Sequence, residues 1–207
     1  MSQKRGRFIV FEGIDGSGKT TQARLLAEKL RAEGREVALT AEPTAYPSGV
    51  ALREALSGKV KRTECQMAAM FVEDRIAHNI HPDTGIRALL ERGVDVICDR
   101  YYYSTLAYQG ETTDYGWVKA MNLLCPEILR PDVCIYVDLL PEQSLERISK
   151  GRDSVEIYEN IETLTAVRER FLFVINDISD KDNVKIVNGY RSVEDVSKDV
   201  YTIVNEI

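Results

Sequence analysis

The segment from Gly13 to Thr20 combines residue types and a spacing that suit the binding of a chain of phosphates. It reads G-x-x-x-x-G-K-T, a pattern in which the glycines let several backbone N–H groups converge on one anion. In this pattern the positively charged side chain of Lys19 contacts the β- and γ-phosphates, and the Thr20 hydroxyl is a ligand for Mg²⁺. A glycine turn between a strand and a helix is the alternative interpretation, but it gives no reason for a lysine followed by a threonine. The predicted phosphate-binding residues are Gly13, Ile14, Asp15, Gly16, Ser17, Gly18, Lys19, Thr20 and Thr21.

The residues around this loop predict the elements that hold it. The run 8–11 is apolar and contains β-branched residues, which is typical of a buried strand. After the loop, apolar residues recur at helical spacing, among them Ala23, Leu26 and Leu30. The motif therefore lies between a strand and the start of a helix, whose positive end adds to the anion site.

Short segments rich in Val and Ile alternate with helical patterns along the rest of the chain. The predicted strands cover residues 7–12, 36–40, 94–98, 133–137 and 184–187. This alternation predicts an α/β fold of three layers, in which a parallel sheet carries helices on both faces. The last helix is the clearest, because Ser192 and Asp195 resemble a capping box and an apolar stripe follows them. We interpret that helix as purely structural.

A less regular helical pattern covers residues 155–178, and a basic segment, 147–152, leads into it. The segment contains Gly151, so it suits a mobile lid over a phosphate site, at about residues 147–156. A solvated helix terminus explains the spacing equally well.

The length and charge of the chain limit the classes of function. The chain has 207 residues and a formal net charge of −6, so we expect one domain spanning residues 1–207. The negative balance argues against a protein held to nucleic acid by surface charge, and no apolar segment predicts a membrane span or a secretory signal. Cys98 and Cys134 lie in apolar runs and predict buried thiols in a reducing compartment. We therefore expect a cytoplasmic protein that captures small anions and has no nucleic-acid or membrane partner.

Two further pairs of residues could do chemistry with a bound phosphate. Asp99 ends a predicted strand, where a carboxylate can hold Mg²⁺ through water; capping of the next helix is the alternative. Arg100 follows it, and its planar fork suits an acceptor phosphate brought close to an equally anionic donor. Phe71 and Arg75 are four residues apart and share a helix face, which fits either packing or ligand binding.

Taken together, these stretches resemble the thymidylate kinases over nearly the whole chain. The segment 11–22 resembles their phosphate loop, 99–104 their D-R-[YF]-x-x-S motif, and Phe71-x-x-x-Arg75 their base-binding helix, while 107–110 and 130–132 also follow their order. The resemblance implies transfer of the ATP γ-phosphoryl group to dTMP, giving dTDP, in a reaction that depends on Mg²⁺. It also implies a sheet of five parallel strands and a homodimer.

The resemblance also implies a role for individual side chains. Phe71 stacks on thymine, and Arg75 donates to a base carbonyl. Asp15 faces the deoxyribose 3′-hydroxyl, which explains an acid within a phosphate loop, and Tyr108 lies near C2′ and disfavours ribose. Gln109 contacts the base, and Tyr158 closes over the nucleotide. The implied substrate-binding residues are Asp15, Phe71, Arg75, Arg100, Ser104, Tyr108, Gln109 and Tyr158, and the implied magnesium ligands are Thr20 and Asp99.

Two positions depart from the family pattern. Gly16 stands where many relatives carry an arginine, and relatives of this second type place catalytic arginines in the lid. The lid candidates here are Arg147, Lys150 and Arg152, with stacking on adenine as a second possible role for Arg147. Ala41 replaces an arginine usual after the second strand, so another cation, such as Arg53, is needed to neutralise the acceptor. The predicted catalytic residues are Lys19, Arg100, Arg147 and Arg152.

Two other functions remain open at this point. A deoxynucleoside kinase needs a base for the acceptor hydroxyl, and Glu42 could supply it. A P-loop protein that uses ATP only as a switch needs no acceptor site, which leaves Phe71 and Arg75 unexplained. A phosphate acceptor requires no strong base, so His78 and His81, near the end of a helical pattern, are expected to be surface or cap residues.

Overall fold

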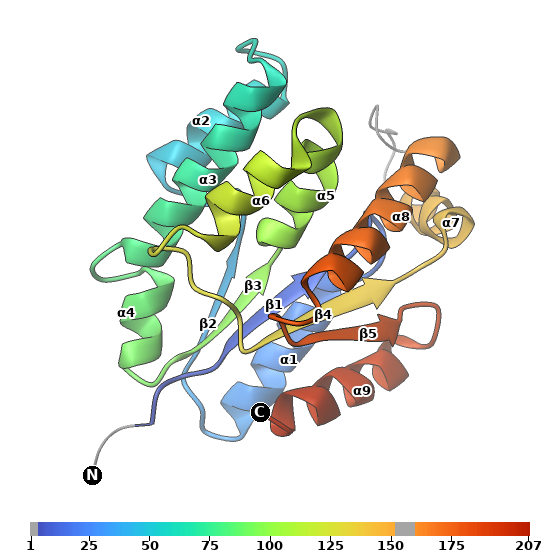
Figure 1. The fold of residues 1–207 in the computed structure, drawn as a ribbon. Helices are drawn as coiled ribbons and strands as arrows, with labels where there is room; N and C mark the ends of the chain where they lie inside the picture. The colour runs from blue at the N-terminus through green and yellow to red at the C-terminus, as the bar shows by residue number, and fades with distance from the viewer. Residues whose placement is uncertain (1–3, 152–159) are drawn as a thin grey trace.

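Five parallel strands form one sheet in the computed structural model, which describes residues 4–151 and 160–207 (Figure 1). The strands are β1 (Phe8–Glu12), β2 (Val37–Ala41), β3 (Asp95–Asp99), β4 (Val133–Asp138) and β5 (Val184–Asn188), in the order β2-β3-β1-β4-β5. The helices are α1 (Lys19–Ala32), α2 (Pro47–Leu56), α3 (Glu64–Ile80), α4 (Ile86–Glu91), α5 (Tyr102–Thr112), α6 (Tyr115–Leu123), α7 (Pro141–Gly151), α8 (Ile161–Ile178) and α9 (Val193–Asn205). The predicted three-layer α/β fold is therefore confirmed.

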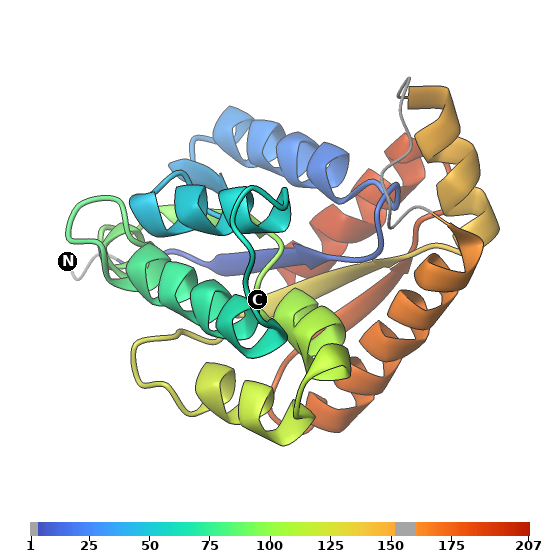
Figure 2. The same ribbon diagram turned by 90° about the horizontal axis from the view of Figure 1, so that it is seen from above.

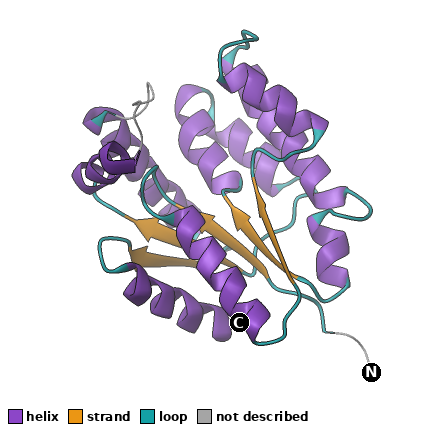
Figure 3. Ribbon diagram, turned by 180° about the vertical axis from the view of Figure 1, so that it is seen from behind, coloured by secondary structure: helices purple, strands orange, loops and turns teal. Residues whose placement is uncertain are grey.

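The alternation of side chains along the central strands creates two separate cores. Ile9 and Phe11 of β1 face one way and pack with α1 and α9, while Phe8 and Val10 face the other way and pack with α3, α5 and α8. Figures 2 and 3 show these two helical layers on opposite faces of the sheet. Because both faces of β1, β3 and β4 are covered, these strands read as continuous apolar runs in the sequence.

All five strands end at the same edge of the sheet, and that edge collects the predicted chemistry. The phosphate loop leaves β1, Asp99 is the last residue of β3, and Glu42 follows β2 directly. Gly189 follows β5 at the same edge. In an open parallel sheet, the crevice outside the carboxyl ends of the strands is where ligands bind. The fold therefore points to one place for the site.

Segment 130–132 belongs to the opposite edge, because it leads into the start of β4. Asp132 accepts a hydrogen bond of 2.6 Å from the backbone N–H of Phe8, and Arg130 pairs with the buried carboxylate of Asp182. This part of the family-like pattern therefore fixes the beginnings of strands and takes no part in the site.

Several local expectations need correction. The outer strands β2 and β5 are only partly buried, since each has a neighbour on one side alone. Helix α8 starts at Ile161 after Asn160, whose side chain accepts from the Thr163 N–H at 2.8 Å, so it begins later than predicted.

Residues 147–151 are the last residues of α7, while Arg152 and Tyr158 lie outside the described residues. Ser192 does cap α9, as expected. Among the described residues, no helix has both the length and the apolarity needed to cross a membrane.

Candidate active site

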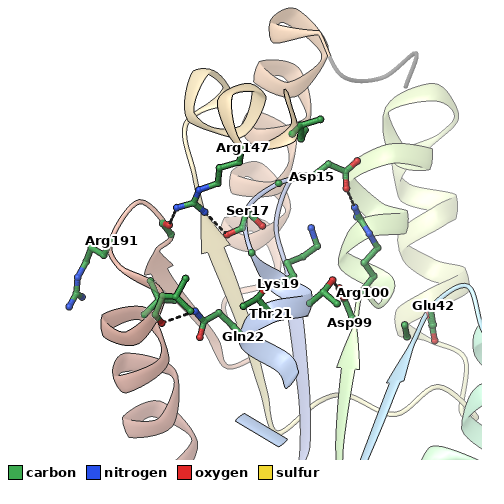
Figure 4. Close-up of a pocket in the computed structure, with 18 residues that line it drawn as sticks. Asp15, Ser17, Lys19, Thr21, Gln22, Glu42, Asp99, Arg100, Arg147 and Arg191 are labelled. Atoms are coloured by element: carbon green, nitrogen blue, oxygen red, sulfur yellow. Dashed lines mark hydrogen bonds and ion pairs between the residues drawn. The ribbon is translucent and has the colours of Figure 1, made fainter. Parts of the chain in front are cut away.

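The phosphate loop borders a cavity of about 620 Å³ at the carboxyl edge of the sheet (Figure 4). Gly13, Gly16 and Gly18 all have positive φ angles, of 147°, 73° and 99°, which is the conformation that glycine adopts at least cost. A side chain at residue 13 would also place its Cβ 2.6 Å from the carbonyl oxygen of Val137. The loop therefore requires glycine for its backbone conformation and for its close approach to β4.

Lys19 is buried in the first turn of α1 and reaches back over the loop. Its ammonium donates to the carbonyl of Ile14 at 2.8 Å. Burial and the nearby charge of Arg100 lower the pKa of Lys19 to about 8, while the carboxylates of Asp15, Asp99 and Glu12 partly offset this decrease. An anion in the cavity would favour the charged form of Lys19, so this side chain suits the binding of phosphate.

Thr20 and Asp99 offer oxygen ligands at the floor of the cavity. The Thr20 hydroxyl donates to Asp99 Oδ2 at 2.5 Å. Asp99 Oδ1 is buried and has no hydrogen-bond partner among residues 4–151 and 160–207. No group of three or more His, Cys, Asp or Glu side chains in that part of the chain could hold a metal by itself. A hard cation bound through a hydroxyl, a carboxylate, water and phosphate oxygens, as Mg²⁺ prefers, fits this pair of residues.

Arg100 lies beside the loop in a conformation rare for residues other than glycine, with a φ of 68°. Its guanidinium forms an ion pair with Asp15 and donates to the Ser104 hydroxyl at 3.1 Å. Burial alone would lower the pKa of Arg100, but Tyr108 and the surrounding carboxylates raise it overall, so the group stays charged. The carboxylate of Asp15 thus points towards a cation, which reduces its repulsion of an anion in the cavity (Figure 4).

Glu12 holds the segment that carries Arg100, and the sequence analysis missed it. Its buried carboxylate accepts from the backbone N–H of Tyr101 at 2.7 Å, and from the N–H and hydroxyl of Ser104 at 3.1 and 2.7 Å. Burial raises the pKa of Glu12 despite the nearby Arg100. Ser104 therefore links Glu12 to Arg100 in the structure. The available signal was an acid at the end of an otherwise apolar strand.

The residues expected to hold the base lie on α3 and α5 and are buried or partly buried. Arg75 is fully buried, with bonds from its guanidinium to Glu42 and Asn122. Phe71 and Gln109 are partly buried, and the ring of Tyr108 packs edge-on against Phe171 with centroids 6.0 Å apart. None of these predicted base-binding residues lines the 620 Å³ cavity, which is bordered by the phosphate loop, Asp99 and Arg100.

His78 contradicts the sequence expectation of a surface or cap residue. Its side chain is 3% exposed, and Nδ1 lies 2.9 Å from Glu42 Oε1. The expectation failed because α3 packs back against the end of β2, which brings His78 to Glu42, a residue 36 positions earlier in the chain. His81 does end α3, as expected, and its ring stacks on Tyr46 with centroids 5.0 Å apart.

Helix α7 packs directly on the phosphate loop and brings Arg147 to the cavity wall. Arg147 donates to the carbonyls of Gly189 at 2.7 Å and Ser17 at 3.4 Å, as Figure 4 shows. The Ser144 hydroxyl donates to the carbonyl of Asp15. A Cβ at Gly16 would lie only 3.0 Å from the Ser144 carbonyl oxygen, so a side chain at this position would require α7 to shift by a few tenths of an ångström.

Ala41 lines the cavity, and its small side chain places no charge there. Arg53 is exposed on α2, and its guanidinium donates to the carbonyl of Pro43 at 2.8 Å, close to the end of β2. It therefore places a positive charge beside the loop that follows β2.

Comparison with known proteins gives one consistent result. The family described as thymidylate kinase matches residues 11–200. The chain is 39% identical to a probable thymidylate kinase of Pyrococcus horikoshii over 97% of this chain and 96% of that protein. It is 38% identical to a probable thymidylate kinase of Methanococcus aeolicus, over 94% and 93% of the two chains. It is 34% identical to the thymidylate kinase of a Sulfurihydrogenibium species, over 93% and 94%.

Proposed function

The chain belongs to the thymidylate kinase family, and from this premise we propose that its site transfers the γ-phosphoryl group of ATP to dTMP, giving dTDP and ADP. The observation that supports the site assignment most directly is the meeting of Lys19 and Arg100 at one cavity. Two anionic nucleotides approach each other only if cations reduce their repulsion. Lys19 follows the loop after β1, and Arg100 follows the neighbouring strand β3.

The residues of the chain act by alignment and by charge. The phosphate loop and Lys19 hold the donor phosphates, and Arg100 holds the acceptor phosphate next to them. Mg²⁺, held through Thr20 and Asp99, would neutralise charge on the donor phosphates. An acceptor phosphate oxygen is already a competent nucleophile, so no residue needs to remove a proton. Arg53 is proposed to supply the positive charge that Ala41 lacks.

The deoxynucleoside kinase alternative is not favoured, because Glu42 is not free to act as a base. Its carboxylate is 3% exposed and is bound on one side by Arg75 at 2.7 Å and on the other by His78 at 2.9 Å. Glu42 lines the cavity, but both of its carboxylate oxygens are already bonded, so accepting a proton from a nucleoside hydroxyl would disrupt its bond to Arg75 or to His78.

The decisive experiment offers the purified protein a panel of nucleoside monophosphates and thymidine with Mg²⁺ and ATP, and measures ADP release. We expect dTMP to give the highest kcat/KM and thymidine to give none. Turnover of thymidine would support a nucleoside kinase. Slow ATP hydrolysis at a rate that no acceptor changes would support a switch protein.

Three further expectations belong to this proposal. Arg147 and Arg152, in a lid at about residues 147–156, supply charge to the transferring group, and Tyr158 closes over the nucleotide. The enzyme works as a homodimer in the cytoplasm, without nucleic-acid or membrane partners. Sedimentation analysis of the full chain, with and without both nucleotides, tests the dimer.

A further inference from the structure

A chain of buried polar side chains runs from β2 to the guanidinium of Arg75. Glu42 Oε2 accepts from Arg75 Nη2 at 2.7 Å, and Glu42 Oε1 lies 2.9 Å from His78 Nδ1. The other imidazole nitrogen, Nε2, lies 2.9 Å from the Thr40 hydroxyl. We propose that His78 and Thr40 are positioning residues: through Glu42 they hold Arg75 in the orientation that selects a pyrimidine with a carbonyl at position 4. This inference rests on the proposed function, and on the contact between Arg75 and a base carbonyl that membership of the family implies.

The hydrogen-bond partners define the direction of the chain. An ionised carboxylate only accepts, so the proton of a neutral His78 must be on Nδ1, facing Glu42. Nε2 is then an acceptor, and the Thr40 hydroxyl donates to it. Because Glu42 and Arg75 already balance each other, a neutral imidazole avoids adding a second buried cation. Each member of the chain therefore has one defined role, and Glu42 cannot rotate without losing a bond.

The same bonds determine what Arg75 can offer to a ligand. Nη1 donates to Asn122 Oδ1 at 2.5 Å, while Nη2 donates to Thr105 at 3.1 Å in addition to Glu42. A guanidinium has five N–H groups and no acceptor. Arg75 Nε is buried and meets no acceptor in the described part of the chain. The guanidinium is thus fixed from two sides and has only donors left to present.

A guanidinium fixed in this way discriminates between pyrimidines by hydrogen-bond polarity. Thymine and uracil carry an acceptor at position 4, whereas cytosine carries an amino group, which would meet another donor. A site built to bond one polarity rejects the other strongly, because its own buried group is then left unpaired. If Arg75 can move, it can turn away from the amino group, and the discrimination decreases.

A purely structural role for His78 would be to hold α3 against the loop after β2. Asp74, on the same helix, already makes bonds of that kind. Asp74 Oδ2 accepts from the N–H of Thr44 at 2.8 Å, and Oδ1 accepts from the hydroxyls of Thr44 and Ser48 at 2.6 and 2.8 Å. The bond to Glu42 is the only hydrogen bond that the His78 side chain makes to that loop in the described part of the chain. What its bond to Glu42 adds is the orientation of Arg75.

The test measures kcat and KM with dTMP and with dCMP for the wild type and four variants. In His78→Leu, we expect KM for dTMP to rise roughly tenfold with kcat nearly unchanged, and the dTMP-to-dCMP ratio of kcat/KM to fall by a similar factor. His78→Asn keeps an N–H donor close to the position of Nδ1, so it should retain most of the ratio. Thr40→Val should lower the ratio by a smaller factor. His81→Ala is the matched control and should change neither.

The outcomes separate the possibilities. If wild-type protein fails to phosphorylate dTMP, the proposed function is wrong. If the wild type is active and folded His78→Leu keeps its ratio within about twofold, the positioning role is wrong. Equal losses of kcat with both substrates, without rescue by His78→Asn, indicate a structural role and also overturn the inference. If His78→Leu does not fold, Thr40→Val decides: an unchanged ratio in that folded variant refutes the proposal.

Discussion

Replacing Lys19 by methionine should make the nucleotide-free protein more stable while removing its ability to hold ATP. Methionine has nearly the same length and no charge, so it keeps the packing and removes the cost of a buried ammonium. The pKa of Lys19 falls from 10.5 to about 8 on folding, and at 1.36 kcal/mol per pKa unit this amounts to about 3 kcal/mol at pH 7. The lost bond to the Ile14 carbonyl costs about 1 kcal/mol. The net gain in the free energy of unfolding should therefore be about 2 kcal/mol.

The pH dependence has a definite sign. Below about pH 8 both the folded and the unfolded wild type carry the proton, so the cost of burying the charge is fully present. Between about 8 and 10.5 the unfolded chain binds more protons than the folded protein, so the wild type gains stability as the pH rises. The advantage of Lys19→Met should thus shrink by about 2 kcal/mol between pH 7 and pH 9.5.

Urea unfolding at these two pH values measures the stability, and calorimetric titration with Mg²⁺ and ATP measures the binding. Binding should weaken roughly 10- to 100-fold, because a charge-assisted bond to phosphate is lost. Lys59→Met, the same change at an exposed lysine, is the control and should alter neither quantity. A Lys19→Met protein that is less stable than the wild type at pH 7, or that binds ATP as tightly, would refute the reasoning.

Three other substitutions test separate parts of the site. Arg100→Ala should lower kcat/KM for dTMP by roughly a thousandfold in a folded protein, since it removes a charge-assisted fork; near-normal turnover with an unchanged circular dichroism spectrum would contradict this role. Gly16→Arg should destabilise the protein by about 1–3 kcal/mol in thermal unfolding, because its φ of 73° and the contact with Ser144 both oppose a side chain. Arg152→Ala should lower kcat more than it weakens dTMP binding, and single-turnover kinetics beside equilibrium titration distinguish this from a pure loss of binding.

The features that could be predicted from the sequence are those that depend on a local pattern of residues. The phosphate loop is identified by its own spacing, and the central strands by apolar runs such as 8–11, because burial on both faces removes polar alternation. Asp99 was placed at the end of β3 from the run that precedes it, and the fold then brings it to the loop. These predictions need only the chain direction and the rule that parallel strands end at one edge.

The missed residues are polar groups whose burial depends on distant contacts. Nothing within α3 distinguishes His78 from an exposed residue near a helix end. Its partner, Glu42, is supplied only when α3 packs against the end of β2. Glu12 becomes a structural acceptor because the segment at Tyr101 folds over it, 89 residues away in the sequence. Likewise, the sequence alone does not decide whether the basic segment 147–152 is a lid or a helix terminus, because the packing of Arg147 at the end of α7 depends on the distant Gly189.

These observations explain how a site rich in cations can exist before its substrates arrive. Lys19 is held by the carbonyl of Ile14, Arg100 by the carboxylate of Asp15, and Arg147 by the carbonyl of Gly189. Each acceptor fixes its cation near the place where phosphate oxygens are to lie, so binding exchanges one set of partners for another. Burial and, after it, the nearby charge of Arg100 lower the pKa of Lys19, so repulsion between the two cations remains. Phosphate binding relieves that repulsion, so the electrostatic cost carried by the free protein favours the complex.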